Sequence, residues 1–469
     1  MTVLRGVLAA GVLAFASVAC AGLIGADPPD LFEPAPDVDS GTADAGPVIV
    51  DDASGTVDSG APPKQVDVAH GIFVSAHSGA DGPSCGAITA PCATIQAGID
   101  SFQAIGASAG KTTVYVASAT YTETITLASG VIVEGGWDEI NNAWRSSAPG
   151  THTVVAATTN AKTVIAESLV QTATLRGLTI RSKSPADVGE SLYGVFARGD
   201  GASATPMLRL ESVTIEIEAG GAGRDGDAST GTGAPSYFPC PTSDDGGAGN
   251  TGTTGSGAEA GSFSSDGYVA ANGGAGGTGS GGREGTAGGA GETKTCAYCV
   301  GPGTCKIMNG DFQGFPGSPG CGGGGGPGGG GGRGGGSSVG VFVWGVTVEI
   351  SGARVASGNG GAGGAGGSGG NGGPGAEGVA GDQKICGPEI MQACSGCNLT
   401  YEYLQGGAAG GTGGTGGKGG YGGSGAGGAS CALFVGDGGA FMIPSTTLAH
   451  GSGGASANGA VGLAADVCP

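Results

Sequence analysis

The fold is decided by the stretch GGAGGAGGSGGNGGPGAEGVAG (residues 360–381), in which every third residue, from Gly360 to Gly381, is glycine. The same count holds from 407 to 428, and shorter stretches repeat it at 246–255, 273–291 and 314–334. A three-residue period is neither helical nor strand-like; it matches the polyproline II helix, which has no internal hydrogen bonds. These stretches are therefore periodic extended chains that carry few side chains able to do chemistry.

Two interpretations of the glycine stretches are open. Their pattern resembles glycine-rich antifreeze bundles and, more loosely, the PGRS-like exported proteins, which implies polyglycine II rods packed antiparallel. The alternative is disorder with loose crosslinks, because fixing each backbone residue costs about 1–2 kcal/mol and glycine buries almost no apolar area in return. The strict period favours order, since a flexible linker needs none. Collagen is a poor third interpretation, because only 314–320 has a convincing Gly-x-Pro pattern.

Composition confines the hydrophobic core to part of the chain. Of 469 residues, 110 are glycine, and apolar β-branched strings lie mainly in 70–217, with short islands near 340–357 and 431–449. The net charge is -21. An acidic surface repels phosphate backbones and anionic headgroups, so neither nucleic acid nor electrostatic membrane binding is expected.

An internal repeat predicts how the apolar segments are arranged. LRLESVTIEIEAGGAG from Leu208 aligns without gaps with VEISGARVASGNGGAG from Val348 and FMIPSTTLAHGSGGAS from Phe441; ATLRGLTIRSKS from Ala173 keeps the register. A short apolar strand precedes three of these copies, at 194, 340 and 432. Three short alternating segments in a unit of about twenty residues predict an all-β protein, a parallel β-helix with one coil per repeat.

The N-terminal part of the core adds a resemblance. Pro91, the helix start ATIQA at 93–97 and GGW at 135–137 lie within residues 70–145, which resemble the opening segment of right-handed parallel β-helix proteins exported by bacteria. The resemblance implies a pectate-lyase-like topology and brings no catalytic residues with it. Ile95, Ile99, Phe102 and Ile105 fall on one helical face. We therefore expect a short helix that caps the open end of the coil, or else an ordinary amphipathic helix packed elsewhere.

The first twenty-one residues are typical of an export signal, with Arg5 followed by an apolar run and small residues around Cys20. Ser17-Val18-Ala19-Cys20 resembles a bacterial lipobox, which implies lipidation of Cys20; ordinary cleavage after Ala21 is the alternative. From 27 to 67 the chain holds ten Asp or Glu against the single Lys64, so it is predicted to be a disordered tether. The expected location is the outer membrane and cell surface, with membrane contact only through the lipid, or alternatively the secreted fraction.

These features divide the chain into successive segments. We expect a signal peptide at 1–21, an acidic Pro-rich tether at 22–67, a β-helix with its N-terminal cap at 68–217, a glycine-rich excursion at 218–338, one coil at 339–357, a second excursion at 358–430, and the last coil with a tail at 431–469.

An even number of cysteines after the signal favours disulfides in an exported protein. They are Cys85, Cys92, Cys240, Cys296, Cys299, Cys305, Cys321, Cys386, Cys394, Cys397, Cys431 and Cys468. The first excursion holds five and the second three, so full oxidation requires a bond that leaves each. We predict a link between the two excursions or to Cys431 or Cys468, with Cys85 bonded to Cys92. Zinc bound by the two Cys-x-x-Cys pairs, 296 with 299 and 394 with 397, is the alternative; otherwise no metal or cofactor is expected.

Catalytic motifs are not apparent in the sequence. Asp187, Arg198 and Asp200 near one turn are the best candidates for the carboxylates and base of a polysaccharide lyase, and solvated turn residues are the plainer interpretation. We therefore expect a non-enzymatic surface lipoprotein with a structural, adhesive or matrix-interacting role, whose partners would be extracellular matrix or polysaccharide. A carbohydrate-active or carbohydrate-binding protein is the alternative, and ice binding is a distant third.

Overall fold

The computed structural model describes residues 64–106, 108–140, 143–147, 152–200, 205, 207–234, 240, 242–300, 306–386 and 402–469. This part of the chain is nearly all β, and its only α-helix is α1 (Ile95–Ser101), followed directly by a π-helical turn (Phe102–Gly106). No helix in the described ranges is both long and apolar enough to cross a membrane. The predicted signal peptide, Cys20 and the predicted tether up to residue 63 lie outside the described ranges.

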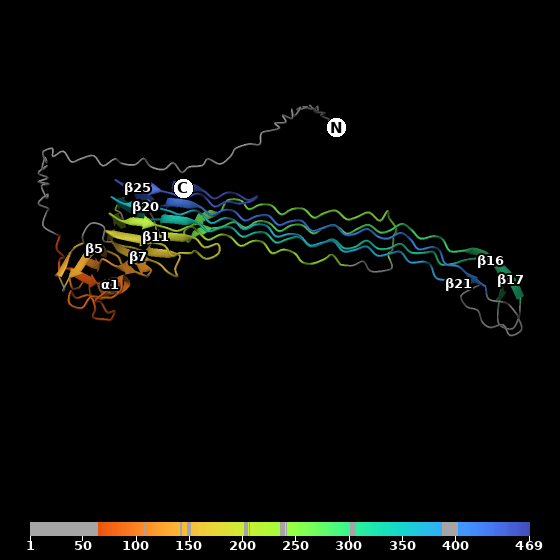
Figure 1. Cartoon of the computed structure of the whole chain (residues 1–469), viewed down its shortest axis with the longest axis horizontal. Helices are drawn as coiled ribbons and strands as arrows, with labels where there is room; N and C mark the ends of the chain where they lie inside the picture. Colours follow the sequence, from red (N-terminus) through yellow and green to blue (C-terminus); the bar gives the residue numbers. More distant parts are fainter. Residues whose placement is uncertain are drawn as a thin grey trace, which may run out of the picture. The chain divides into compact units, whose positions relative to one another are not determined.

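Three parallel sheets form the core of the protein (Figure 1). The first sheet contains β1 (Gly71–Val74), β2 (Thr113–Ala117), β5 (Ile132–Ile140), β9 (Ala173–Arg176), β12 (Leu208–Glu211), β19 (Thr347–Ser351) and β24 (Ala440–Met442), with β6 (Ala143–Ser146) antiparallel to β5. The second contains β3 (Thr120–Tyr121), β7 (Thr153–Ala156), β10 (Leu178–Arg181), β13 (Thr214–Glu216), β20 (Arg354–Ala356) and β25 (Thr447–Ala449). The third contains β4 (Ile125–Thr126), β8 (Lys162–Glu167), β11 (Leu192–Arg198), β18 (Ser338–Trp344), β23 (Ser430–Val435) and β26 (Ala464–Cys468).

The chain visits the three sheets in a fixed order, so β9, β10 and β11 are followed by β12, β13 and β18 in the same three sheets. The strands pair in the register predicted by aligning the repeats. Leu208 lies opposite Val348, Val348 opposite Phe441, and Ala173 opposite Leu208. Each pairing therefore places the shared apolar positions of the repeat on top of one another.

Apolar side chains of the three sheets meet in one continuous core. Val133, Leu175, Leu210 and Ile350 are fully buried members of it, contributed by successive strands of the first sheet. Alternate residues of a strand point to the same face, so each pass of the chain adds one layer to this core. Burial of apolar area, worth roughly 25 cal/mol per Å², is what stabilises this part of the protein.

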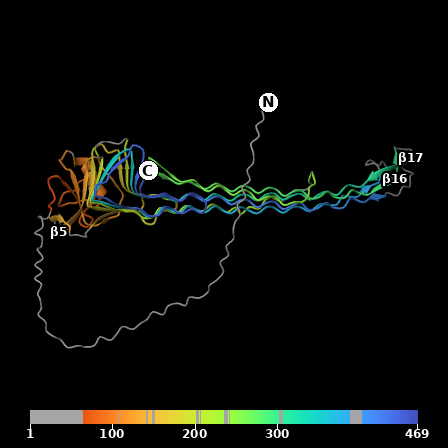
Figure 2. The same ribbon diagram turned by 90° about the horizontal axis from the view of Figure 1, so that it is seen from above.

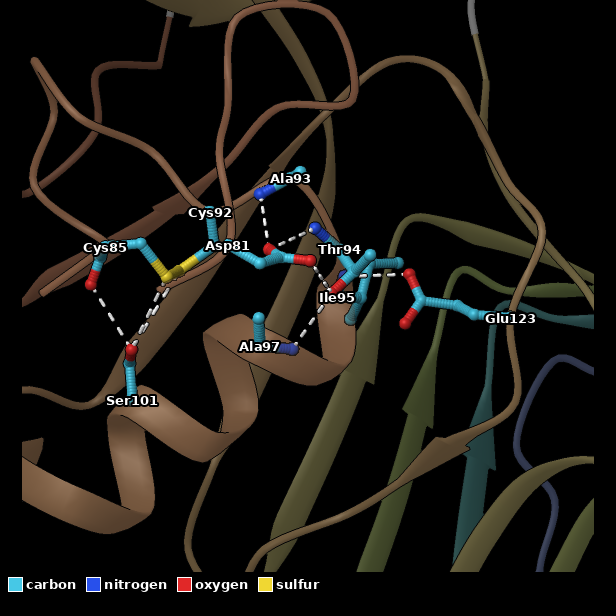
Figure 3. The surroundings of a disulfide bond; sticks show 9 residues. All are labelled: Asp81, Cys85, Cys92, Ala93, Thr94, Ile95, Ala97, Ser101 and Glu123. Atoms are coloured by element: carbon cyan, nitrogen blue, oxygen red, sulfur yellow. Dashed lines mark hydrogen bonds between the residues drawn. A yellow bond between two sulfur atoms is a disulfide. The ribbon is translucent and has the colours of Figure 1, made fainter. Parts of the chain in front are cut away.

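Helix α1 contributes Ile95 and Ile99 to the same core, both fully buried. The Thr94 side chain accepts a hydrogen bond from the Ala97 N–H, and the Glu123 carboxylate accepts bonds from the N–H groups at 95 and 96 (Figure 3). The predicted helical face is wrong at Ile105, which is 50% exposed. The α-helix ends at Ser101, and the wider π-helical turn rotates the chain away from the face that Ile95 begins.

The glycine-rich segments leave the core between the second and the third sheet each time, after β13, β20 and β25. We number them run 1 (220–234), run 2 (246–258), run 3 (273–291), run 4 (314–336), run 5 (358–381), run 6 (406–428) and run 7 (451–462). In Figures 1 and 2 the long runs lie side by side. Their described residues are ordered by hydrogen bonds between runs, so the disordered alternative does not hold for them.

Hydrogen bonds join the runs at every third residue. The N–H groups of 323, 326, 329 and 332 in run 4 donate to the carbonyls of 414, 417, 420 and 423 in run 6, a parallel pairing. The N–H groups of 364, 367, 370 and 373 in run 5 donate to 333, 330, 327 and 324 in run 4, an antiparallel pairing. The prediction of purely antiparallel packing is therefore wrong, because a rod without side chains can accept neighbours of both directions around its axis.

Close approach of the runs explains why they are glycine. A Cβ on Gly326 would lie 2.3 Å from the Gly370 carbonyl oxygen, and one on Gly325 would lie 1.7 Å from that of Gly279. Run 4 contacts runs 1, 3, 5 and 6 and is the richest in glycine. Every third residue of run 4 faces run 1. This face is less crowded than the others, and Pro327 and Arg333 lie on it. The number of neighbours thus determines how many faces of a run must be glycine.

Two antiparallel hairpins follow the ends of the runs that lie away from the sheets. β16 (Thr293–Val300) and β17 (Lys306–Gln313) join run 3 to run 4, and β21 (Lys384–Ile385) and β22 (Tyr403–Leu404) join run 5 to run 6. At about 3.1 Å per residue, run 4 places these hairpins roughly 70 Å along the bundle from β18. Cys296 and Cys299 therefore lie in one hairpin strand, and Cys386 directly follows another.

Candidate functional site

The residues predicted as lyase candidates do not converge. Asp187 Oδ2 lies 2.8 Å from Lys183 Nζ, whereas Arg198 Nη1 lies 2.6 Å from Asp266 Oδ1. Asp200 is exposed. The ion pair with Asp187 raises the pKa of Lys183, which keeps this lysine charged and unsuited to act as a base. Within the described ranges, no group of His, Cys, Asp or Glu has the geometry to hold a metal ion.

Disulfides join four pairs of cysteines among the described residues. Cys85 bonds to Cys92, Cys240 to Cys321, Cys296 to Cys386, and Cys431 to Cys468. The pair 296–386 links the two glycine-rich excursions, which is one of the two alternatives that the parity of the cysteines left open. Because Cys296 is in this disulfide, it is not available to the zinc site considered for 296 and 299. Cys299 lies in β16, while Cys305, Cys394 and Cys397 lie outside the described residues.

The Cys85–Cys92 disulfide fixes the loop in front of α1 (Figure 3). The Ser101 hydroxyl donates to the Cys85 carbonyl at 3.2 Å, and the Asp81 carboxylate accepts from the Ala93 N–H at 2.7 Å. All these bonds are internal to the loop and the helix. This disulfide is therefore structural, and it does not form part of a reactive site.

A row of aromatic rings covers the third sheet on the face opposite the main core. Phe196, Phe342 and Phe434 occupy equivalent positions in β11, β18 and β23. The first two rings are parallel with centroids 4.5 Å apart, and the second and third are 5.1 Å apart. Tyr193 packs edge-on against Phe196. The sequence contains the signal for this row, because GVFAR, GVFVW and ALFVG carry Phe at one repeat position.

A hairpin from the first glycine-rich excursion packs on this aromatic row. It consists of β14 (Ser262–Ser264) and β15 (Gly267–Val269). The Tyr268 N–H donates to the Tyr193 hydroxyl at 2.7 Å, and the Phe263 ring stacks on Phe434 with centroids 3.9 Å apart. Burial raises the pKa of both Tyr193 and Tyr268, so both phenols stay protonated at neutral pH.

A cleft of about 660 Å³ lies where the hairpin, the end of β23 and the last glycine run meet. Phe263, Tyr268, Trp344 and Phe434 are among its lining residues. The Trp344 ring lies against the backbone of Gly436, where a Cβ would come within 2.0 Å of its Cε3. Glycine at this position therefore leaves room for the indole beside the cleft.

Polar groups border the cleft on its open side. Asp437 and Ser262 are exposed lining residues, and Gly438 follows Asp437 in the turn after β23. Within the part of the chain that the structure describes, neither the Asp437 carboxylate nor the Ser262 hydroxyl has a hydrogen-bond or ion-pair partner. The cleft thus combines aromatic lining residues with unengaged oxygen atoms at its rim.

Sequence reasoning missed this cleft, because its residues come from segments far apart in the chain. The walls come from 263–268, inside a glycine-rich excursion, and from 344 and 434, at β18 and β23. Parallel pairing brings β18 and β23 side by side, and the β14–β15 hairpin meets them only because the excursion returns to the sheet.

No family model, curated protein or solved structure matches this chain.

Proposed function

We propose that the three parallel sheets are the three faces of a right-handed parallel β-helix and that α1 caps one end of it. The repeated order of sheets along the chain supports this proposal, since each pass contributes one strand to each sheet. The position of β1 at the edge of the first sheet, with Ile95 and Ile99 packed near Ile72, supports the capping role. A cap of this kind protects an edge strand from pairing with another chain.

The protein acts, on this proposal, as a non-enzymatic surface protein with a structural, adhesive or matrix-interacting role. The observation that carries it is the continuous ladder of main-chain bonds from the sheets to the disulfide-linked hairpins. A bundle in which every run is held by its neighbours cannot bend without breaking several such bonds. It is therefore suited to hold the β16–β17 and β21–β22 hairpins at a fixed distance from the β-helix. We call this the spacer role of the bundle.

Lipidation of Cys20 would attach this arrangement to the outer membrane, with residues 22–67 as the tether. Secretion without an anchor is the alternative. A Cys20→Ser variant should leave the membrane fraction and appear in the medium with its β structure unchanged. A variant that fractionates like the wild type would exclude the anchor but leave the spacer role standing.

The spacer role is tested with purified protein coupled to beads through an N-terminal tag. Beads carrying the wild type should adhere to extracellular polysaccharide matrix, and no new reducing ends or unsaturated sugars should appear with calcium present. Removal of one glycine period from every run at the same level should shorten the bundle by about 9 Å and weaken adhesion. Turnover that is lost in an Asp200→Ala variant would instead support the polysaccharide-lyase alternative.

A further inference from the structure

The aromatic cleft beside Trp344 has no part in the spacer role. The main core differs from this cleft, because aliphatic side chains such as Leu210 and Ile350 fill it. Here, rings line a space of about 660 Å³ that is open to solvent. This volume falls within the range of about 300–1,000 Å³ that is typical of small-molecule sites.

The aromatic residues that line the cleft indicate which class of ligand it could bind. Phe263 and Phe434 are stacked on each other, within 23°, and Phe434 is buried, so these two rings cover each other's faces. Trp344 lines the cleft, is partly exposed and lies parallel to Phe342, within 11°. An aromatic face such as that of its indole carries negative charge at its centre and attracts weakly positive C–H groups. A pyranose ring has a flat face of C–H groups and a rim of hydroxyls, and it matches such an aromatic face better than a branched aliphatic side chain does.

The polar groups at the rim of the cleft favour a ligand that carries hydroxyl groups and no negative charge. The Asp437 carboxylate and the Ser262 hydroxyl offer acceptor oxygens, and the N–H of Gly438 makes no hydrogen bond among the described residues. Sugar hydroxyls can donate to the oxygens and accept from the N–H. The carboxylate, together with the net charge of -21, disfavours uronic acids and other anionic sugars.

We propose that this cleft binds a ring of a neutral hexose polysaccharide through stacking on Trp344. The proposal rests on the adhesive role inferred above, for which it supplies a ligand class. Stacking provides most of the contact area, while the Asp437 carboxylate orients the hydroxyls. Gly436 keeps the indole in place, so it acts as a positioning residue.

Calorimetric titration of the full chain with cellohexaose, laminarihexaose and maltohexaose tests the proposal. At least one of these neutral hexamers should bind, and an oligogalacturonate of equal length should bind at least tenfold more weakly. Trp344→Ala should lower the affinity at least tenfold, and Trp344→Phe should lower it less because a ring remains. Gly436→Ala should also weaken binding, since the new methyl displaces the indole.

Tyr421→Ala is the matched control, because Tyr421 is 53% exposed on run 6 and does not line the cleft. It should bind the hexamer like the wild type. Asp437→Asn should reduce the discrimination against oligogalacturonate while keeping the stacking contact. Circular dichroism and urea midpoints that equal those of the wild type would show that each variant is folded.

Three outcomes would overturn the proposal: no neutral hexamer binds, the Trp344→Ala variant binds as tightly as the wild type, or oligogalacturonate binds at least as well. Sedimentation that shows self-association abolished by Trp344→Ala would assign the cleft to a second copy of the chain instead. Bead adhesion to matrix that persists in Trp344→Ala, with no hexamer binding to the wild type, would reject the sugar site and leave the adhesive role intact.

Discussion

The three-sheet core and the glycine bundle belong to one chain but are stabilised by different physics. The core buries aliphatic side chains such as Leu175, Leu210 and Ile350 completely. In the bundle, glycines such as Gly326 and Gly422 contact neighbouring carbonyl oxygens directly, with no side chains between the runs. Each main-chain hydrogen bond makes a net contribution of only about 0.5–1.5 kcal/mol to stability, so the bundle depends on many small contributions of equal size. The core depends on fewer buried side chains, each with a larger contribution.

The largest expected effect comes from breaking the aromatic row on the third sheet, on the face opposite the main core. Phe342→Ala removes the ring between Phe196 and Phe434 and should lower the free energy of unfolding by about 3–5 kcal/mol. Urea unfolding followed by tryptophan fluorescence measures it. Val170→Ala, at a position 80% exposed, is the control and should change it by less than about 0.5 kcal/mol. A loss under about 1 kcal/mol for Phe342→Ala would contradict the assignment of this row to a stabilising cluster.

Removing the disulfide between the excursions should come next. Cys296 and Cys386 are 90 residues apart in sequence, and a crosslink over so long a loop stabilises by about 2–4 kcal/mol. A variant with both Cys296→Ser and Cys386→Ser should lose this stabilisation at the hairpins only. Hydrogen exchange should speed up at 292–296 and 402–405 and stay unchanged in β11. The matched control is Cys85→Ser with Cys92→Ser, a separation of 7 residues, which should cost less and leave the hairpins protected. Faster exchange in β11 would indicate that bundle and core unfold together.

Two adjacent residues of run 6 allow the bundle to be tested by itself. Gly422→Ala places a Cβ 1.9 Å from the Gly330 carbonyl oxygen and should destabilise by about 1–3 kcal/mol. Tyr421→Ala, one residue earlier, removes a larger but exposed group and should change stability by less than about 0.5 kcal/mol. Limited proteolysis of the runs provides the readout. Equal protease resistance in the two variants would show that close contact between runs is not what requires glycine.

The smallest effect concerns a charge at helix α1. Burial raises the pKa of Glu123 above its ordinary value near 4.5, although it accepts bonds from the N–H groups of Gln96 and Ile95. The folded state therefore binds this proton more tightly than the unfolded state. The resulting stability is present below about pH 4.5 and is lost as pH rises through the raised pKa. Glu123→Gln should lack this dependence while it keeps one acceptor oxygen.

Thermal unfolding at pH 4 and at pH 7 measures how the stability of the wild type and of Glu123→Gln depends on pH. The wild type should lose more stability than Glu123→Gln between these two values, by an amount under about 1 kcal/mol. Glu134→Gln is a useful comparison, because it changes a carboxylate that is ion-paired with Lys64 and Arg176. A Glu123→Gln variant with the same pH dependence as the wild type would assign the effect to another group.

Much of the fold could be predicted because it depends on local repetition. The gapless alignment of Leu208 with Val348 gave the correct register, since parallel strands of successive repeats pair at equivalent positions. The cysteine parity predicted a bond that leaves each excursion, either to the other excursion or to Cys431 or Cys468, and the 296–386 disulfide is the first of these alternatives. The candidate site could not be predicted in this way. Phe263 lies in a glycine-rich segment and meets Phe434 only after the excursion returns to the sheets.

The sequence by itself determined the periods: three residues for the glycine runs, two for the strands, and about twenty for the repeating unit. A period follows from backbone geometry, which each residue obeys locally. Tertiary structure alone decided which runs are neighbours, whether they are parallel or antiparallel, and where aromatic residues gather. These depend on contacts between Gly326 and Gly370, or Trp344 and Gly436, that are distant in sequence. Glycine offers no side chain to encode its partner, so only the assembled bundle selects it.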